Sequence, residues 1–136
     1  MRRIVLYVED DDAAYHLFRV ALEEADLHVQ FHRVSNGDQA LQFLQKAGAY
    51  GDAPRPALIL LDLNLPGRNG FDILGELKTS ESFRAIPVII FSSSSLASDK
   101  ARSLNLGAED FVTKPSSLDL LVDTLKSALH ADSSFD

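Results

Sequence analysis

The alternation of short apolar runs with segments of helical periodicity constrains this fold more than any other feature of the chain. Five apolar runs lie at residues 4–8, 29–34, 57–61, 88–91 and 111–112. The first, third and fourth runs are rich in Val, Ile and Leu without alternation, which is typical of strands buried on both faces of a parallel sheet. The second run, VQFHRV, alternates polar and apolar residues, so we place it nearer a sheet edge.

Segments with the 3.6-residue period of an amphipathic helix follow the runs. The clearest has apolar residues at 118, 121, 122, 125 and 129, and the weakest spans residues 96–104. Polar residues stand where helix N-caps are expected: Asp11 or Asp12, Asn36, Asn69, and Ser116 or Ser117. Strand and helix thus alternate five times with short connections, which predicts right-handed βαβ units. We predict an α/β fold, a doubly wound five-stranded parallel sheet of the flavodoxin-like type with strand order 2-1-3-4-5.

Composition excludes several classes of protein. A chain of 136 residues suits one domain, for which we expect residues 1–130, with residues 131–136 as a flexible tail. The net charge of −7 makes direct nucleic-acid binding a poor fit. The absence of cysteine excludes thiol catalysis, disulfides and cysteine-based metal sites. No apolar run approaches the roughly 18 residues of a membrane helix, and acids follow the first run too soon for a signal peptide, so we expect a cytoplasmic protein.

Polar residues with a shared chemistry follow the predicted strands. Glu9 and Asp10 follow the first strand, Asp62 the third, Ser92 the fourth and Lys114 the fifth. In doubly wound folds ligands bind beyond the carboxyl ends of the strands, so these side chains are expected to converge. Three crowded carboxylates repel one another, and a divalent cation relieves the repulsion. Few oxygen ligands with room for water favour Mg²⁺ over Ca²⁺.

Asp62 is the candidate nucleophile of this set. A carboxylate can form an acyl phosphate, and the metal and Lys114 would neutralise the oxygens of the transferring phosphoryl group. Asn64, two residues further on, can offer its backbone carbonyl to the metal. The residues therefore predict phosphoryl transfer to Asp62.

The same residues resemble a known signature. The pair Glu9-Asp10, Asp62 within LLDLNLPG, Ser92 after VIIF, and Lys114-Pro115 are together similar to bacterial response regulator receiver domains. The resemblance covers residues 3 to 130. It implies that Asp62 is the phosphoacceptor and that Glu9, Asp10, Asp62 and the Asn64 carbonyl hold Mg²⁺. It also implies that Lys114 contacts the phosphoryl group, that Ser92 is the switch hydroxyl and that Phe111 is the switch aromatic.

Two positions depart from the commonest pattern of that family. Glu9 stands where Asp is more usual, which puts in doubt whether this side chain binds the metal directly or through water. Ser92 stands where Thr is more usual, which keeps the hydroxyl and loses a methyl group. The loop at residues 47–56 and the DLNLP sequence resemble the subgroup paired with phytochrome-type histidine kinases.

The resemblance implies a stand-alone response regulator of a two-component phosphorelay. A histidine kinase or a phosphotransfer protein would be the partner, a homodimer is a further expectation, and no external substrate is turned over. Phosphorylation is expected to change the surface formed by residues 96–104, the fifth strand and the last helix.

Other interpretations of the same residues stay open at this point. A Mg²⁺-dependent phosphohydrolase would use Asp62 as nucleophile, but it commonly has a second Asp where this chain has Asn64. A protein-interaction module would keep the fold without the chemistry, and a flavin-binding protein would need a phosphate cradle after the first strand. We interpret Asp11 and Asp12 as helix caps and the four histidines as surface or packing residues.

Overall fold

The computed structural model describes residues 3–130, which form five strands, five α-helices and one short 3-10 helix. The predicted tail at residues 131–136 lies outside the described residues. The elements in chain order are β1 (Arg3–Val8), α1 (Asp12–Ala25), β2 (Val29–Val34), α2 (Gly37–Gln45), the 3-10 helix η1 (Gly48–Tyr50), β3 (Leu58–Leu61), α3 (Gly70–Thr79), β4 (Val88–Ser92), α4 (Ala97–Asn105), β5 (Asp110–Thr113) and α5 (Leu118–His130).

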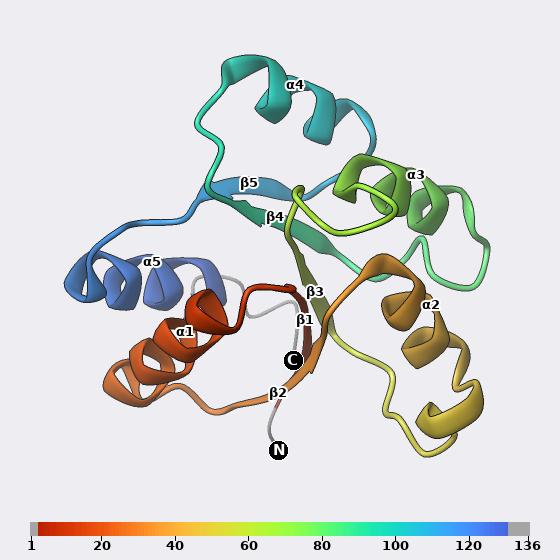
Figure 1. The fold of residues 1–136 in the computed structure, drawn as a ribbon, viewed down its shortest axis with the longest axis horizontal. Helices are drawn as coiled ribbons and strands as arrows, with labels where there is room; N and C mark the ends of the chain where they lie inside the picture. Colours follow the sequence, from red (N-terminus) through yellow and green to blue (C-terminus); the bar gives the residue numbers. More distant parts are fainter. Residues whose placement is uncertain (1–2, 131–136) are drawn as a thin grey trace.

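The five strands form one parallel sheet in the order β2-β1-β3-β4-β5, which confirms the predicted order 2-1-3-4-5 (Figure 1). Val8 is paired with Val34 of β2 and with Leu61 of β3, so these three strands end at one level. The chain segments that leave them therefore emerge side by side at the carboxyl edge. Within residues 3–130, no helix is long and apolar enough to cross a membrane.

Helices cover both faces of the sheet, as the doubly wound fold requires. Helices α1 and α5 lie together on one face, and α2 and α3 lie on the other (Figure 1). Successive strand residues point to opposite faces, so Leu6 and Val8 join one core while Val5 and Tyr7 join the other. Burial on both faces explains why β1, β3 and β4 lack polar alternation.

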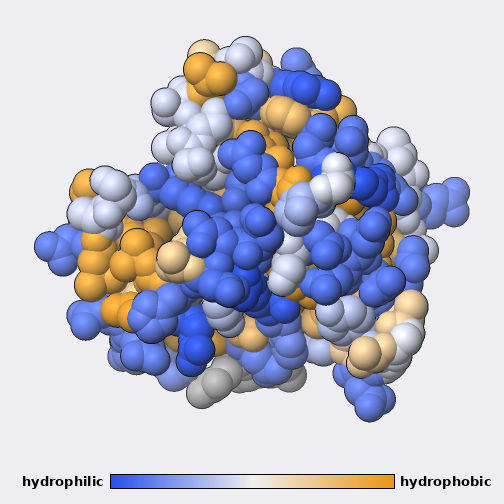
Figure 2. Space-filling view, viewed as in Figure 1, coloured by the Kyte–Doolittle hydropathy of each residue, from blue (hydrophilic) through white to orange (hydrophobic). Residues whose placement is uncertain are grey.

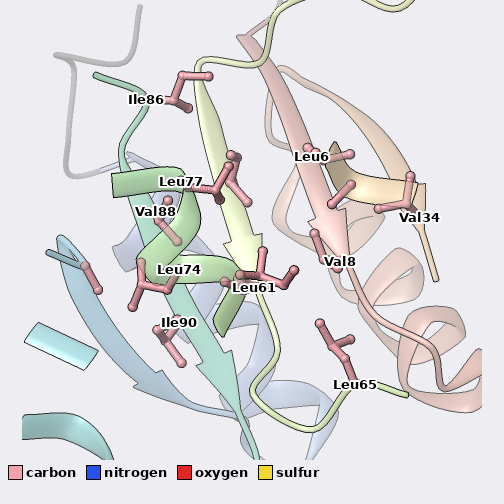
Figure 3. Packing of buried hydrophobic residues seen from close by; sticks show 14 of the residues in the cluster. Leu6, Val8, Val34, Leu61, Leu65, Leu74, Leu77, Ile86, Val88 and Ile90 are labelled. Carbon is pink, nitrogen blue, oxygen red and sulfur yellow. The ribbon is translucent and has the colours of Figure 1, made fainter. Parts of the chain in front are cut away.

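The larger core lies between the sheet and α2 and α3. Figure 3 shows Leu74 and Leu77 of α3 directed at the sheet beside Leu61, Val88 and Ile90. All five side chains are at most 2% exposed. Helix α3 is thereby fixed directly against β3 and β4, whose ends carry two of the candidate site residues.

Side-chain caps start most of the helices where the sequence predicted them. Asp11, rather than Asp12, caps α1 by accepting from the Ala13 N–H at 3.0 Å. Asn36 and Asn69 cap α2 and α3 in the same way. The sequence offered Ser116 or Ser117 as the cap of α5. The Ser117 hydroxyl accepts from the Leu120 N–H at 3.3 Å, so Ser117 is the cap.

The structure corrects three details. Ser92 is the last residue of β4 rather than the residue after it, because its pairing with Thr113 extends the ladder by one position. The loop at residues 47–56 contains the 3-10 helix η1, whose Tyr50 has its ring 5.6 Å from that of Phe43. Helix α4 spans Ala97–Asn105, one residue later than expected.

Candidate functional site

Three carboxylates meet beyond the carboxyl ends of β1 and β3. Val8 and Leu61 are paired, so the residues after them, Glu9 and Asp62, start at the same level of the sheet. Glu9, Asp10 and Asp62 each offer one carboxylate oxygen such that all three atoms lie within 4.8 Å of one another. Glu9 and Asp62 are buried, whereas Asp10 is exposed. The structure thus brings together the three acids that the sequence singled out.

Lys114 reaches these acids from the end of β5. Its backbone N–H donates to the Ser92 carbonyl at 2.7 Å, which fixes this part of the chain against the end of β4. Its Nζ donates to Asp62 Oδ2 at 3.1 Å and also to Glu9 Oε1. The same Nζ lies 5.9 Å from the centre of the Phe91 ring. The Lys114 side chain is only 17% exposed, so its charge is shared between two acids with little water around it.

Burial and proximity shift the proton affinities of the site. Burial raises the pKa of Glu9 above its ordinary value of 4.5, and Asp62 raises it further, while Lys114 partly offsets both effects. Burial lowers the pKa of Lys114, but the hydrogen bonds and charges of Glu9 and Asp62 outweigh burial, and the net pKa is raised. Lys114 is therefore an ammonium at neutral pH.

The donor set fits a divalent cation. Three carboxylates and one ammonium leave two negative charges uncompensated, and a divalent ion supplies the matching charge. Carboxylate oxygens are hard ligands, and the exposed Asp10 leaves one side open to water. Glu9, Asp10 and Asp62 are the residues that would hold the ion.

The remaining candidate residues are Asn64, Ser92 and Phe111. The Asn64 N–H donates to Asp62 Oδ1 at 3.2 Å, which helps to orient the Asp62 carboxylate. Ser92 is fully buried, and its hydroxyl oxygen accepts from the Ser94 N–H at 3.3 Å. Phe111 is buried in the core on the α2 and α3 face. The metal-binding role of the Asn64 carbonyl and the switch roles of Ser92 and Phe111 stay predictions.

Sequence reasoning missed Arg33, which braces the loop that carries the acids. Its Nε donates to the carbonyl oxygen of Glu9 at 2.8 Å, and its Nη1 donates to Asp12 Oδ1 at 2.8 Å. Its guanidinium carbon lies 4.8 Å from the centre of the Tyr15 ring, within the range of a cation–π contact. Asp12 is thus an ion-pair partner rather than the helix cap that we expected. The available signal was an arginine near the carboxyl end of the strand that neighbours β1.

Two more residues near the acids also escaped the sequence analysis. A Cβ on Gly70 would lie 2.4 Å from the carbonyl oxygen of Asp62 and 2.6 Å from Leu63 Cα, so only glycine lets α3 start this close to the Asp62 loop. The Tyr7 hydroxyl donates to Glu9 Oε1 at 3.3 Å from within the core. Tyr7 lies in β1 and Glu9 directly follows the strand, so their spacing of two residues places them on one face of the sheet and was a readable signal.

Comparison with known proteins agrees with this geometry. The sequence model of the response regulator receiver domain matches residues 5–126. The chain is 34% identical over 116 residues to response regulator Rcp1 of Synechocystis sp., covering 85% of this chain and 79% of Rcp1.

Two solved structures share the fold and the sequence signal. The phosphorylated cyanobacterial phytochrome response regulator RcpA is 31% identical with a TM-score of 0.86, covering 98% of each chain. The Mn²⁺-bound form of Rcp1 is 31% identical with a TM-score of 0.84, covering 96% of each chain. The acidic cluster of this chain is a divalent-metal site of the kind found in receivers. The chain belongs to the response regulator receiver domains, signalling proteins that accept a phosphoryl group on an aspartate rather than turning over a substrate.

Proposed function

We propose that Asp62 is the phosphoacceptor of a Mg²⁺-dependent phosphorelay and takes its phosphoryl group from a phosphohistidine. The observation that carries this proposal is the position of the buried Asp62 carboxylate, which accepts from the Lys114 ammonium and has an oxygen within 4.8 Å of carboxylate oxygens of Glu9 and Asp10. Within residues 3–130, Glu9, Asp10 and Asp62 form the one group of three or more Asp, Glu, His or Cys side chains close enough together to hold a metal ion.

In the transfer step, one Asp62 oxygen forms a bond to phosphorus. The bond between phosphorus and the imidazole nitrogen of the donor breaks, and that nitrogen keeps the electron pair. The Asn64 N–H holds Oδ1 and Lys114 holds Oδ2, so the carboxylate is oriented before the donor arrives. Lys114 then compensates charge on the phosphoryl oxygens. Glu9, Asp10, Asp62 and the Asn64 carbonyl would hold Mg²⁺, which supplies further charge neutralisation when bound.

The proposed switch runs from Ser92 and Phe111 to the surface of α4, β5 and α5. Two hydrogen bonds link the end of β4 to α4: Ser94 N–H donates to the Ser92 hydroxyl, and the Ser94 hydroxyl donates to Asp99 Oδ2 at 2.6 Å. Thr113 Oγ1 donates to the Ser94 carbonyl at 3.0 Å, which links the same loop to β5. A shift of Ser92 toward a phosphoryl group would disturb this chain of bonds and so move α4.

Helix α4 is loosely anchored, which supports its role in this switch. Its one buried residue is Ser103, and its apolar Leu104 is 41% exposed. Leu96 before α4 and Leu120 on α5 are also exposed, and Figure 2 shows apolar residues on the surface over both helices. We propose that this α4-β5-α5 surface makes the output contacts, including contacts with a second copy of the chain.

We further propose that the protein is a stand-alone regulator in the cytoplasm. Its partner would be a histidine kinase of the phytochrome type, or a phosphotransfer protein. The likeness to RcpA, a phytochrome response regulator, supports this choice of kinase. Phosphotransfer from a panel of purified histidine kinases tests it: faster transfer from a phytochrome-type kinase than from the others is the expected result, and equal or slower transfer would contradict it.

The phosphoacceptor proposal is tested with acetyl phosphate and intact-mass measurement. With Mg²⁺ the wild-type chain should gain the mass of one phosphoryl group, and hydroxylamine should remove it as expected of an acyl phosphate. Asp62→Asn should abolish the gain. Asp72→Asn, at an exposed aspartate on α3, should leave it unchanged. A gain that persists in Asp62→Asn would remove Asp62 from this role.

A further inference from the structure

We propose that Tyr7 is a positioning residue of the metal site, holding the Glu9 carboxylate in place through its hydroxyl group. This inference rests on the proposed function, because it gives the Glu9 carboxylate a role toward the metal. Tyr7 itself would touch neither the metal nor the phosphoryl group.

The geometry of β1 explains how Tyr7 reaches Glu9. Residues two apart on a strand share a face and are separated by about 6.6 Å along it. Tyr7 and Glu9 therefore lie on the same face, and the Tyr7 hydroxyl donates to Glu9 Oε1 at 3.3 Å. The glutamate side chain is one methylene longer than aspartate, which lets its carboxylate fold back to meet that hydroxyl. The pair Tyr7 and Glu9 therefore acts as a unit that an aspartate at position 9 would break.

Burial makes this hydrogen bond consequential. Tyr7 and Glu9 are each 1% exposed, so water cannot replace a lost donor. The Tyr7 ring is packed 4.3 Å from the ring of Phe18 and 6.1 Å from that of Phe91, centre to centre, which fixes the hydroxyl in space. The Tyr7 pKa is raised far above its ordinary value, by burial first and then by the charges of Glu9 and Asp62, so the phenol stays protonated and remains a donor.

The lysine shared between two acids gives Tyr7 a distinct task. Glu9 Oε1 accepts from both Tyr7 and Lys114, and Oε2 accepts from the Asp11 N–H at the long distance of 3.4 Å. When Lys114 turns to a phosphoryl group on Asp62, Glu9 loses its charged donor. The Tyr7 hydroxyl remains in place and keeps the buried carboxylate oriented toward the metal. Removing that hydroxyl should therefore weaken metal binding, since loss of a residue that hydrogen-bonds to a metal ligand typically lowers metal affinity about 10–100-fold.

Tyr7→Phe tests this inference because it removes one oxygen and keeps the ring. We expect calorimetry to show roughly tenfold weaker Mg²⁺ binding by Tyr7→Phe than by the wild type. Tyr50→Phe, which removes the same atom from a ring that packs on Phe43 away from the site, should bind Mg²⁺ like the wild type. The Mg²⁺ concentration for half-maximal phosphorylation by acetyl phosphate should rise by the same factor, while the rate at saturating Mg²⁺ stays within about twofold.

Repeating the Tyr7→Phe substitution in a Glu9→Asp variant separates a positioning role of Tyr7 from general damage to the fold. In Glu9→Asp the shorter carboxylate cannot reach the hydroxyl, so adding Tyr7→Phe should not weaken Mg²⁺ binding any further. Equal Mg²⁺ affinity of Tyr7→Phe and the wild type would overturn the inference. A tenfold loss that recurs in the Glu9→Asp background would also overturn it. A wild-type chain that binds no Mg²⁺ would instead refute the proposed function, so the two failures are distinguishable.

Discussion

Replacing Lys114 with methionine gives the sharpest test of the charge balance in the site. Within residues 3–130, Lys114 is the cation that contacts both Glu9 and Asp62. Methionine keeps an unbranched side chain of similar length, so packing against Phe91 changes little. Without metal, the variant leaves two buried carboxylates facing each other with no cation between them.

The decrease in the free energy of unfolding depends on how the variant can relieve the repulsion between the two carboxylates. Leaving a buried charge without its partner costs about 3–5 kcal/mol. The folded variant can instead protonate Glu9, whose ordinary pKa is 4.5. Protonating such a group costs about 1.36 kcal/mol for each pH unit above that value, hence about 3.4 kcal/mol at pH 7 and about 1.4 kcal/mol at pH 5.5. We therefore expect Lys114→Met to lower the free energy of unfolding by about 3 kcal/mol at pH 7 and by about 1 kcal/mol at pH 5.5.

The sign of this pH dependence follows from proton linkage. Lys114 lowers the pKa of Glu9, so its loss should raise that pKa further in the folded variant. Glu9 should then hold a proton in the folded variant at pH values where the unfolded chain has released it. Stability rises on acidification wherever the folded state binds more protons than the unfolded state. The gap between variant and wild type should therefore narrow as the pH falls from 7 toward 4.5.

Urea denaturation followed by circular dichroism, with EDTA present, measures both values. Lys126→Met, at an exposed lysine of α5, is the matched control and should change stability by less than about 0.5 kcal/mol. Added Mg²⁺ should restore part of the loss, because an ion that binds only the folded state stabilises it. A loss below about 1 kcal/mol at pH 7, or the same loss at both pH values, would refute the reasoning.

Three further outcomes are expected. Gly70→Ala should destabilise the fold by more than about 2 kcal/mol because its Cβ would collide with backbone atoms. Gly75→Ala in the same helix, where a Cβ meets nothing within 4 Å, should stabilise the fold by about 0.5–1 kcal/mol. Equal urea midpoints for the two variants would contradict this expectation. Because a protonated Glu9 cannot ligate and its pKa is raised, calorimetric Mg²⁺ affinity should start to fall above pH 4.5 on acidification; a fall confined to lower pH would contradict the raised pKa. Asn69→Ala removes the cap that accepts from the Asp72 N–H at 3.0 Å and should cost about 1 kcal/mol in thermal unfolding, and an unchanged melting temperature would exclude that role.

The fold was predictable because its two periodicities are clean. Strands buried on both faces must be apolar throughout, so β1, β3 and β4 stand out as runs of Val, Ile and Leu. The capping side chains mark the helix starts because each one satisfies a backbone N–H that would otherwise lack a partner. Once the strand order is known, the carboxyl ends of the strands fix where Glu9, Asp62 and Lys114 must meet.

The contacts that refine the site were harder to predict because they depend on register and side-chain reach. Arg33 supports the Glu9 carbonyl only because Tyr7 pairs with Arg33 in the parallel register between β1 and β2. The pattern of apolar runs identifies the strands but does not give the pairing register between β1 and β2. The 3-10 helix η1 has the backbone hydrogen bond from Tyr50 N–H to the Ala47 carbonyl and a Tyr50 ring 5.6 Å from that of Phe43, neither of which a Gly- and Pro-rich composition predicts.

The position of Lys114 links charge at the site to movement of the fold. Its ammonium lies between Glu9 and Asp62, while its backbone N–H is bound to the Ser92 carbonyl at 2.7 Å. On the proposed mechanism, a phosphoryl group on Asp62 brings a charge of about −2 and draws the ammonium away from Glu9. Because the Lys114 N–H is hydrogen-bonded to Ser92 at the end of β4, movement of Lys114 would act on the place where the Ser92 hydroxyl accepts from the Ser94 N–H. On this proposal, Lys114 couples the charge on Asp62 to the loop that leads into α4.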